Sequence, residues 1–274
     1  MKTKVIGALA LAGSMAFNAA AVANETISVV GSSSVTPLME VFGETYSKAN
    51  PSVFVEVQGP GSSAGIRAAK DGSADLGMSS RNLKDSEKSS DLKEIVVARD
   101  GIAVVVHNSN PVKDLNKEDV TKIYKGEITN WKQVGGEDKP IVVVTRDTAS
   151  GTRGAFEDIM SLKKKINDIK VSAISQRAQV ASGNGQLKTT VANNPFAIGY
   201  ISLGTVDNSL KAVSVDGHAP SVAAIKSGEY KVQRPFLVLY KTTKISPASQ
   251  TFLDWTQTEE AQQLVSGKGY IAVN

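Results

Sequence analysis

The chain has 274 residues, 41% of them hydrophobic, which suffices for one large domain or two lobes of about 100 to 150 residues each. Lysine and arginine number 31 and aspartate and glutamate 27, for a formal net charge of +4. The lack of cysteine excludes disulfides, thiol catalysis and a lipid-modified N-terminal cysteine, and two histidines leave little from which to build a metal site, so we expect no metal and no cofactor.

The N-terminal segment has the features of a secretory signal. Lys2 and Lys4 precede an apolar run over 5–17, and Ala21-Val22-Ala23 has the small-x-small pattern of a signal-peptidase site. We expect cleavage after Ala23 and a soluble periplasmic product, because no apolar run reaches the roughly 20 residues of a membrane span. Cleavage would remove two lysines and no acid, lowering the charge from +4 to +2. This near-neutral balance argues against nucleic acid or a membrane surface as a partner.

Strand and helix patterns alternate through the first half of the chain. Strand patterns occupy residues 27–30, 53–57, 74–78, 94–98 and 101–107. The first two lead into amphipathic helix patterns, one over 37–46 and one through Ile66, Ala68 and Ala69. This order predicts a three-layer α/β lobe.

The alternation continues through the second half of the chain and predicts a second lobe of the same kind, before the last patterns return to the first lobe. Helix patterns cover 119–125, 151–160, 246–255 and 259–265, and strand patterns cover 139–146, 197–202 and 235–240. The predicted fold class is therefore α/β, with two three-layer lobes joined by two crossing strands near 101–107 and 234–240. We expect a first lobe of residues 24–103 and 237–274 and a second lobe of residues 104–236.

Three clusters rich in serine and glycine each stand directly before a helix pattern. They are GSSSVTP at 31–37, GPGSSAGIR at 59–67 and RDTASGTRG at 146–154, named here the first, second and third clusters. A helix N-terminus has unpaired N–H groups and a partial positive charge, glycine lets the backbone approach an oxyanion, and hydroxyls add donors. Ligands of open α/β sheets bind beyond the carboxyl ends of strands, so the clusters should face each other across a cleft and hold a tetrahedral anion.

The competing interpretation is that the clusters only cap helices, since Ser, Thr and Gly are ordinary N-cap residues. A single polar oxygen is enough for a cap. Three serines in a row, or two flanked by glycine, exceed that need, and Arg146 and Arg153 beside the third cluster favour an anion site.

Several segments in this order resemble the periplasmic phosphate-binding proteins of the high-affinity phosphate ABC transporter, within the type 2 periplasmic-binding-protein superfamily. The resemblance covers nearly the whole chain after residue 23. The segments that carry it are GSSSVTP, GPGSSAG, ADLGMSSRNL (74–83), VTKIYKGEITNW (120–131), TRDTASGTR (145–153) and NPFAIGYISLG (194–204).

The resemblance implies a binding protein, not an enzyme, that captures inorganic phosphate between two lobes and delivers it to membrane permease subunits. It also implies a monomer. Matching positions place the phosphate ligands at Ser33, Ser34, Val35 (through its amide), Thr36, Ser62, Ser80, Arg81, Arg146, Ser150, Gly151 (through its amide) and Thr152.

One departure from the family pattern concerns selectivity. Family members carry an aspartate where this chain has Ser80 followed by Arg81, and the resemblance ties that aspartate to acceptance of a phosphate proton and rejection of sulfate. A buried acceptor facing a fully ionised oxyanion is left unpaired. Here the acceptor is the Ser80 oxygen, Asp75, Asp147 or none of them. Arg81 either contacts the ligand or pairs on the surface with Asp85.

Other functions remain open at this point. A receptor for sulfate, molybdate or tungstate fits the same donors, and an exported phosphate binder could serve sensing or adhesion instead of transport. The segment Gly61-Ser-Ser-Ala-Gly65 also matches the G-x-S-x-G nucleophile elbow, which would make Ser63 a hydrolase nucleophile with His107 or His218 as its base. No HGGG-type oxyanion loop accompanies it in the sequence.

Overall fold

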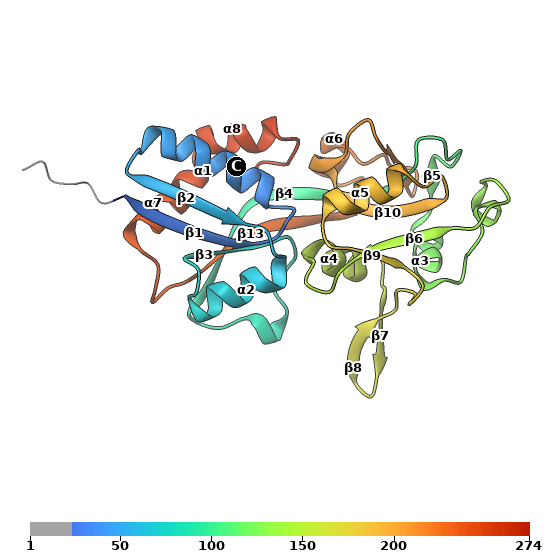
Figure 1. Ribbon diagram of the computed structural model, residues 1–274, viewed down its shortest axis with the longest axis horizontal. Coiled ribbons are helices and arrows are strands. Elements are labelled where there is room, and N and C mark those ends of the chain that lie inside the picture. Colours follow the sequence, from blue (N-terminus) through green and yellow to red (C-terminus); the bar gives the residue numbers. More distant parts are fainter. Residues whose placement is uncertain (1–23) are drawn as a thin grey trace, which may run out of the picture.

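The computed structural model describes residues 24–274, so the expected signal segment 1–23 lies outside the described residues. Two lobes lie side by side and are joined by the long strands β4 (Leu92–Val106) and β13 (Gln233–Lys241) (Figure 1). The first lobe contains β1 (Glu25–Gly31), α1 (Thr36–Ala49), β2 (Val53–Gln58), α2 (Ser62–Asp71), β3 (Leu76–Ser79), the 3-10 helix η1 (Asp85–Glu87), α7 (Pro247–Thr256) and α8 (Glu259–Gly267).

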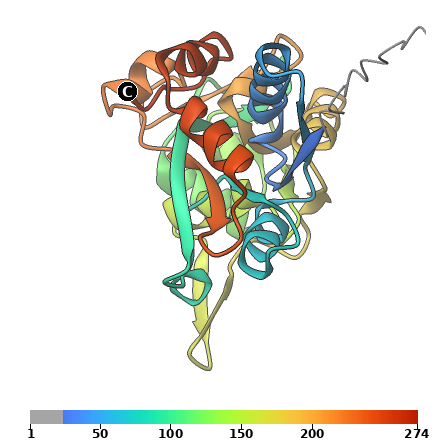
Figure 2. The same ribbon diagram turned by 90° about the vertical axis from the view of Figure 1, so that its left-hand side faces the viewer.

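The second lobe is built from the middle of the chain. Its elements are β5 (Asp114–Leu115), α3 (Lys117–Lys125), η2 (Trp131–Val134), β6 (Val142–Arg146), α4 (Gly151–Ile159), β7 (Lys163–Ile166), β8 (Ile169–Ser172), β9 (Gln179–Ala181), α5 (Asn184–Ala192), β10 (Ala197–Ser202), η3 (Leu203–Thr205), β11 (Lys211–Ala212), β12 (Ser214–Val215) and α6 (Val222–Lys226). The β7–β8 hairpin projects away from the body of this lobe (Figure 2).

One mixed sheet runs through both lobes, in the order β2-β1-β3-β13-β4-β10-β6-β9. The strand β4 changes its pairing partner midway: it is antiparallel to β13 as far as Gly101 and antiparallel to β10 from Ile102 onward. The sequence pattern predicted two strands, 94–98 and 101–107. They are one strand, because Arg99 and Asp100 keep the register by pairing with Pro235 and Arg234.

Side chains of the central strands alternate between two hydrophobic cores, one on each face of the sheet. In the second lobe, Val104 and Val106 join the core under α3 and α4, whereas Ala103 and Val105 join the core under α5. In the first lobe, β13 alternates in the same way between the core under α1, α7 and α8 and the core under α2. Each lobe is thus a three-layer α/β sandwich, as predicted. Within residues 24–274, no helix combines the length and apolar character needed to cross a bilayer.

Candidate anion-binding site

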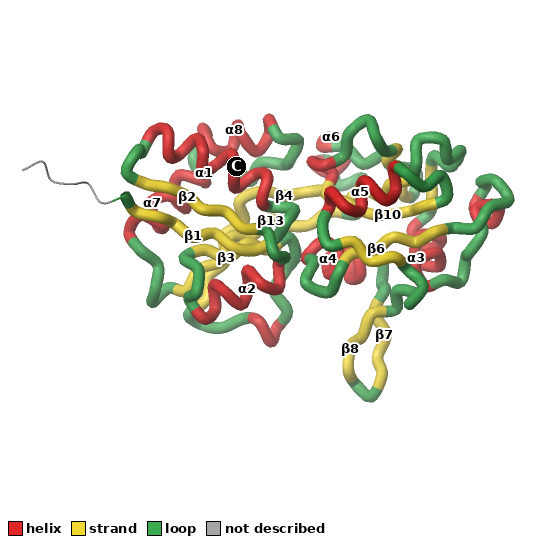
Figure 3. Tube along the Cα trace, viewed as in Figure 1, coloured by secondary structure: helices red, strands yellow, loops and turns green. Residues whose placement is uncertain are grey.

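All three clusters lie where the two lobes meet, as short loops between a strand end and a helix start (Figure 3). The first and second clusters follow β1 and β2 in the first lobe, and the third follows β6 in the second. Ser34 Oγ lies 2.9 Å from Thr152 Oγ1, and the Ser63 N–H donates to Ala149 O at 3.1 Å. Hydrogen bonds between the clusters therefore join the two lobes.

Ser32, Ser62 and Ser80 form a buried hydroxyl network on the first-lobe side of this junction. Ser32 Oγ donates to Ser80 Oγ at 2.8 Å, the Ser80 N–H donates to Ser62 Oγ at 3.1 Å, and the hydroxyls of Ser62 and Ser80 are 3.4 Å apart. Such a set of small, rotatable donors can adapt to the oxygens of a small anion.

Gly151, the first residue of α4, packs directly against this network. A Cβ atom there would lie 2.1 Å from Ser62 Oγ and 2.6 Å from Ser80 Oγ, distances that a real side chain does not tolerate. The absence of a side chain lets the positive end of the α4 dipole reach the hydroxyls of the first lobe.

The capping interpretation fails for two of the three clusters. The N-caps of α1 and α2 are Val35 and Gly61, and neither helix has a side-chain cap. Only in the third cluster does a serine cap its helix, with Ser150 Oγ accepting from the Arg153 N–H at 3.2 Å. The serines of the first and second clusters thus have a use other than capping.

Arg146 is a cation at the junction, and it is buried with 1% of its surface exposed. Its guanidinium donates to Asn184 Oδ1 at 2.8 Å, Ser33 Oγ at 3.1 Å, and the carbonyl oxygens of Ala181 and Ser182, both at 3.2 Å. All four acceptors are neutral, and Arg146 takes part in no ion pair among residues 24–274. Burial lowers the pKa of Arg146, while the charge of Asp147 acts in the opposite direction.

Two other buried arginines near the junction, Arg234 and Arg81, and the half-buried Arg153 each have a carboxylate partner. Arg234 pairs with Asp100 at 2.8 Å, Arg153 with Glu157 at 2.8 Å, and Arg81 with Glu87 at 2.7 Å. Burial lowers the pKa of Arg234, against the effect of Asp100, and burial raises the pKa of Asp100. Arg146 differs from them because, within residues 24–274, no carboxylate forms an ion pair with it.

Most of the residues expected to bind the ligand gather at this junction. Those brought together there are Ser33, Ser34, Ser62, Ser80, Arg146, Ser150, Gly151 and Thr152. The backbone N–H groups of Val35 and Thr36 both donate to Ser32 O at 3.0 Å, inside the turn that starts α1. Arg81 forms a two-pronged bond to Glu87, not to Asp85, and also donates to Ser63 Oγ at 3.4 Å.

The structure adds three residues that the sequence reasoning did not select. Asn184 Nδ2 donates to Ser34 Oγ at 3.0 Å, and Ser32 links the first cluster to Ser80. Arg234 Nη1 donates to Ser80 Oγ at 3.2 Å. Asn184 follows Ser182-Gly183 at the start of α5, a shorter Ser/Gly signal of the same type, whereas Arg234 lies within a strand and has no such signal.

Both carboxylates considered as proton acceptors make other contacts. Asp75 Oδ2 accepts from Ser28 N at 2.8 Å and from Ser28 Oγ at 2.6 Å, ahead of β3 and thus at the opposite end of that strand from Ser80. Asp147 Oδ1 accepts from the Ala149 N–H at 2.7 Å, which closes the loop of the third cluster.

The hydrolase alternative finds no support in the geometry. Ser63 contacts Arg81 and Ala149, His107 Nδ1 lies 2.8 Å from Ser109 Oγ, and His218 is exposed in a turn that bridges to Val215. The three residues are therefore not brought together as nucleophile and base. Among residues 24–274, no group of His, Asp and Glu has the spacing of a metal site.

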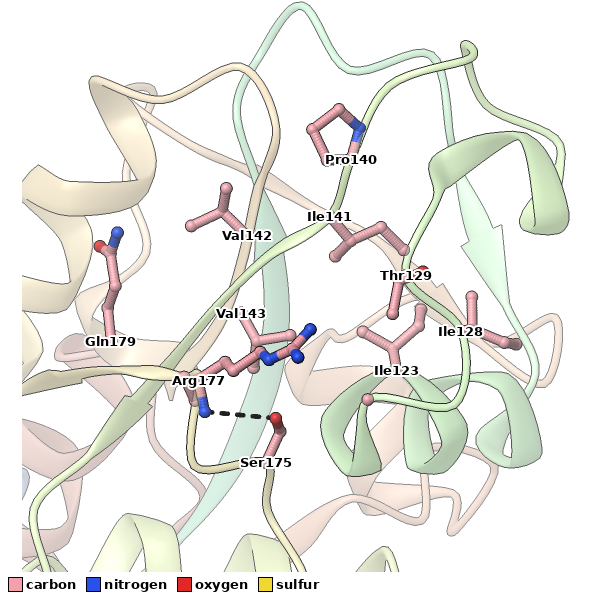
Figure 4. A pocket seen from close by; sticks show the side chains of 12 residues that line it. Ile123, Ile128, Thr129, Pro140, Ile141, Val142, Val143, Ser175, Arg177 and Gln179 are labelled. Carbon is pink, nitrogen blue, oxygen red and sulfur yellow. Dashed lines mark hydrogen bonds between the residues drawn. The ribbon is translucent and has the colours of Figure 1, made fainter.

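A cavity of 610 Å³ opens elsewhere in the second lobe, beside α3 and β6 (Figure 4). Its lining includes Ile123, Ile141, Val143, Ser175 and Arg177, and none of the three clusters contributes to it. The candidate site is therefore the junction between the lobes, where the three clusters meet, and not this cavity.

Comparison with known proteins agrees with the geometry. Residues 18–260 match the PBP superfamily domain. The phosphate-binding protein PstS of Bacillus subtilis is 30% identical over 261 residues, covering 92% of this chain and 82% of that protein. PstS of Borreliella burgdorferi is 29% identical over 278 residues, covering 100% of this chain and 99% of that protein.

Two solved structures share 42% identity with this chain. One, from Clostridium perfringens, is described as a phosphate ABC transporter substrate-binding protein with bound phosphate; it has a TM-score of 0.86 and covers 91% of this chain and 100% of its own. The other, an ABC-type phosphate transport receptor from Vibrio cholerae, has a TM-score of 0.77 and covers 90% of this chain and 100% of its own. These matches confirm the fold and the resemblance seen in the sequence. The chain therefore belongs to the PstS family of phosphate-binding proteins within the PBP superfamily.

Proposed function

We propose that this protein is a periplasmic solute-binding protein that captures inorganic phosphate between its lobes and delivers it to an ABC transporter. The observation that carries the proposal is Arg146, a buried cation whose hydrogen-bond partners are all neutral. A buried charge without compensation is costly, so a ligand of opposite charge between the lobes would complete the site.

The donors around Arg146 fit a tetrahedral oxyanion. The hydroxyls of Ser34, Ser62, Ser80 and Thr152 come from both lobes, and the N-termini of α1, α2, α4 and α5 surround them. Charge-assisted hydrogen bonds contribute about 1.5 to 3 kcal/mol each, and sub-micromolar affinity needs more than about 8 kcal/mol, so several converging donors suffice. The relatives described as phosphate-binding support phosphate as the anion.

Ligand capture would shift the protein between an open and a closed arrangement. Only the closed arrangement places Ser34 beside Thr152 and Ser33 beside Arg146, so an anion touching both sides stabilises it. The strand β4 changes its pairing partner from β13 to β10 after Gly101. This change supports the division into a first lobe of residues 24–103 and 237–274 and a second lobe of residues 104–236. In this proposal the protein acts as a monomer, is not an enzyme, and presents its closed form to the permease subunits.

A second candidate is a receptor for sulfate, molybdate or another tetrahedral oxyanion. Ser80 favours it, because this position carries a hydroxyl where the family pattern has an aspartate. A site without an acidic acceptor rejects a fully ionised oxyanion less strongly.

The test is calorimetric titration of the protein, freed of endogenous ligand, with phosphate and then with sulfate. Arg146→Ala should weaken phosphate binding at least tenfold, about 1.4 kcal/mol, because it removes the buried cation. Arg177→Ala removes an exposed arginine of the same lobe and should leave the affinity unchanged. Wild-type protein that binds sulfate but not phosphate would establish the second candidate, and an unchanged Arg146→Ala affinity would remove this residue from the site.

A further inference from the structure

A polar cavity of 240 Å³ adjoins the junction between the lobes. Ser63 lines it from the first turn of α2, next to Ser62, and Thr148 and Ser150 line it from the third cluster, next to Gly151. The cavity and the proposed phosphate site therefore share the N-terminal ends of two helices, one from each lobe. Ser63, which lines the cavity, directly follows Ser62 of the hydroxyl network, so the cavity is next to that network.

Basic side chains dominate the lining of this cavity. Five cations border it: Arg81, Lys84, Arg153, Lys163 and Lys170. Three of them are balanced, because Arg81 pairs with Glu87, Arg153 with Glu157 and Lys163 with Asp158. Among the described residues, Lys84 and Lys170 form no ion pair, so their ammonium groups are the excess positive charge of the cavity.

The projecting hairpin supplies one wall of the cavity. In its register Lys163 pairs with Ser172 and Lys165 with Lys170, so Lys163, Lys170 and Ser172 share one face of the two strands. All three line the cavity, and the same face borders a larger hollow of 540 Å³ whose other wall is residues 81–86 of the first lobe. The hairpin thus sets two lysines opposite the first lobe, at the edge of the junction.

We propose that this cavity is an outer capture site for inorganic phosphate, which holds the anion briefly before it enters the junction. The inference rests on the proposed function and adds the route by which phosphate enters the junction. A cleft lined by charge of one sign concentrates counter-ions and raises association rates, and the effect falls with ionic strength. Lys84 approaches from the first lobe and Lys170 from the second, so an anion between them lies on the path to the shared helix ends.

The experiment measures the association and dissociation rate constants of inorganic phosphate by stopped-flow fluorescence, at low and high ionic strength. The test variant is Lys84→Gln with Lys170→Gln. The matched control is Lys125→Gln with Lys226→Gln, which makes the same change in net charge at exposed positions on α3 and α6. At low salt the test variant should associate about three to ten times more slowly than wild type, with an unchanged dissociation rate, and the difference should disappear at high salt.

Three results would overturn the capture site while leaving phosphate binding itself in place. They are an unchanged association rate in the test variant, an equal loss in the control variant, and a change confined to the dissociation rate. Wild-type protein that binds no phosphate at all would instead overturn the proposed function, and the capture site with it.

Discussion

Arg234 on β13 donates a hydrogen bond from Nη1 to Ser80 Oγ at 3.2 Å, which connects a crossing strand to the end of β3. Ser80 Oγ also accepts from Ser32 Oγ at 2.8 Å. A hydroxyl oxygen has two acceptor lone pairs, so both are occupied and the remaining O–H can only donate. With both of these contacts in place, we expect Ser80 to donate to a bound anion and not to accept a phosphate proton.

This donor role leads to a prediction about selectivity. Ser80→Asp should place a carboxylate beside the ligand, which accepts the proton of a protonated phosphate and repels sulfate. We expect the ratio of phosphate to sulfate affinity to rise at least about tenfold, chiefly through weaker sulfate binding. Competition calorimetry measures the ratio, and Ser80→Asn is the control of equal size without the charge. An equal change in Ser80→Asn would show that shape, not charge, governs the selectivity.

The Arg234–Asp100 pair should contribute strongly to stability, because both side chains are almost fully buried, with 1% and 0% exposed. Arg234→Met leaves the Asp100 carboxylate without its partner, and breaking such a pair typically costs about 3 to 5 kcal/mol. The double variant Arg234→Met with Asp100→Asn should lose clearly less unfolding free energy than Arg234→Met alone. Urea unfolding gives both values, and a double variant as unstable as the single one would contradict this account.

Gly151→Ala should separate binding from folding. Gly151 is the first residue of α4, where helix propensity matters less than in a helix interior, and the collision of an added Cβ lies between the lobes and not within one of them. The unfolding free energy of the open, ligand-free protein should therefore change little. The added Cβ would collide with Ser62 Oγ and Ser80 Oγ and hold the lobes apart, so phosphate affinity should fall at least about a hundredfold. Gly185→Ala in α5 is the matched control, because a Cβ there meets no atom within 4 Å. Binding at wild-type strength in Gly151→Ala would mean that the lobes need not approach so closely.

Glu87 should contribute a pH-dependent part of the stability. Burial acts to raise the pKa of Glu87, but the hydrogen bonds from Arg81 and the Lys84 N–H outweigh it and bring the pKa below its ordinary value of 4.5. Because the folded pKa is the lower one, the stabilisation is present above pH 4.5 and is lost as the pH falls through the folded value.

Glu87→Gln should therefore lower the unfolding free energy near neutral pH and reduce its decline in acid. Urea unfolding between about pH 3 and pH 7 measures both effects. Glu40→Gln on the exposed side of α1 is the control, since Glu40 forms no ion pair within residues 24–274. If the unfolding free energy of Glu87→Gln declines in acid as steeply as that of wild type, other carboxylates cause the acid sensitivity.

Much of the architecture was readable in the sequence because the signals are local. Short apolar runs rich in β-branched residues marked the central strands, and Ser/Gly runs before helices marked the three clusters. Arg146 was identified because it lies within such a run. The β7–β8 hairpin gave no such signal, since its lysine-rich strands have no buried face to impose an alternation, and Ile166 and Ile169 at its tip are exposed.

Tertiary structure alone decided which groups meet and in what role. Asn184 reaches Ser34 across 150 residues of sequence, and Arg234 reaches Ser80 across 154. Pairings at such separation depend on how the crossing strands bring the lobes together, which no short window of sequence contains. The sequence by itself determined the donor types and the strand ends that carry them. Only packing determined that Arg146 is buried with neutral hydrogen-bond acceptors and that Ser80 Oγ accepts from both Arg234 and Ser32, because burial and hydrogen-bond partners are properties of the assembled fold.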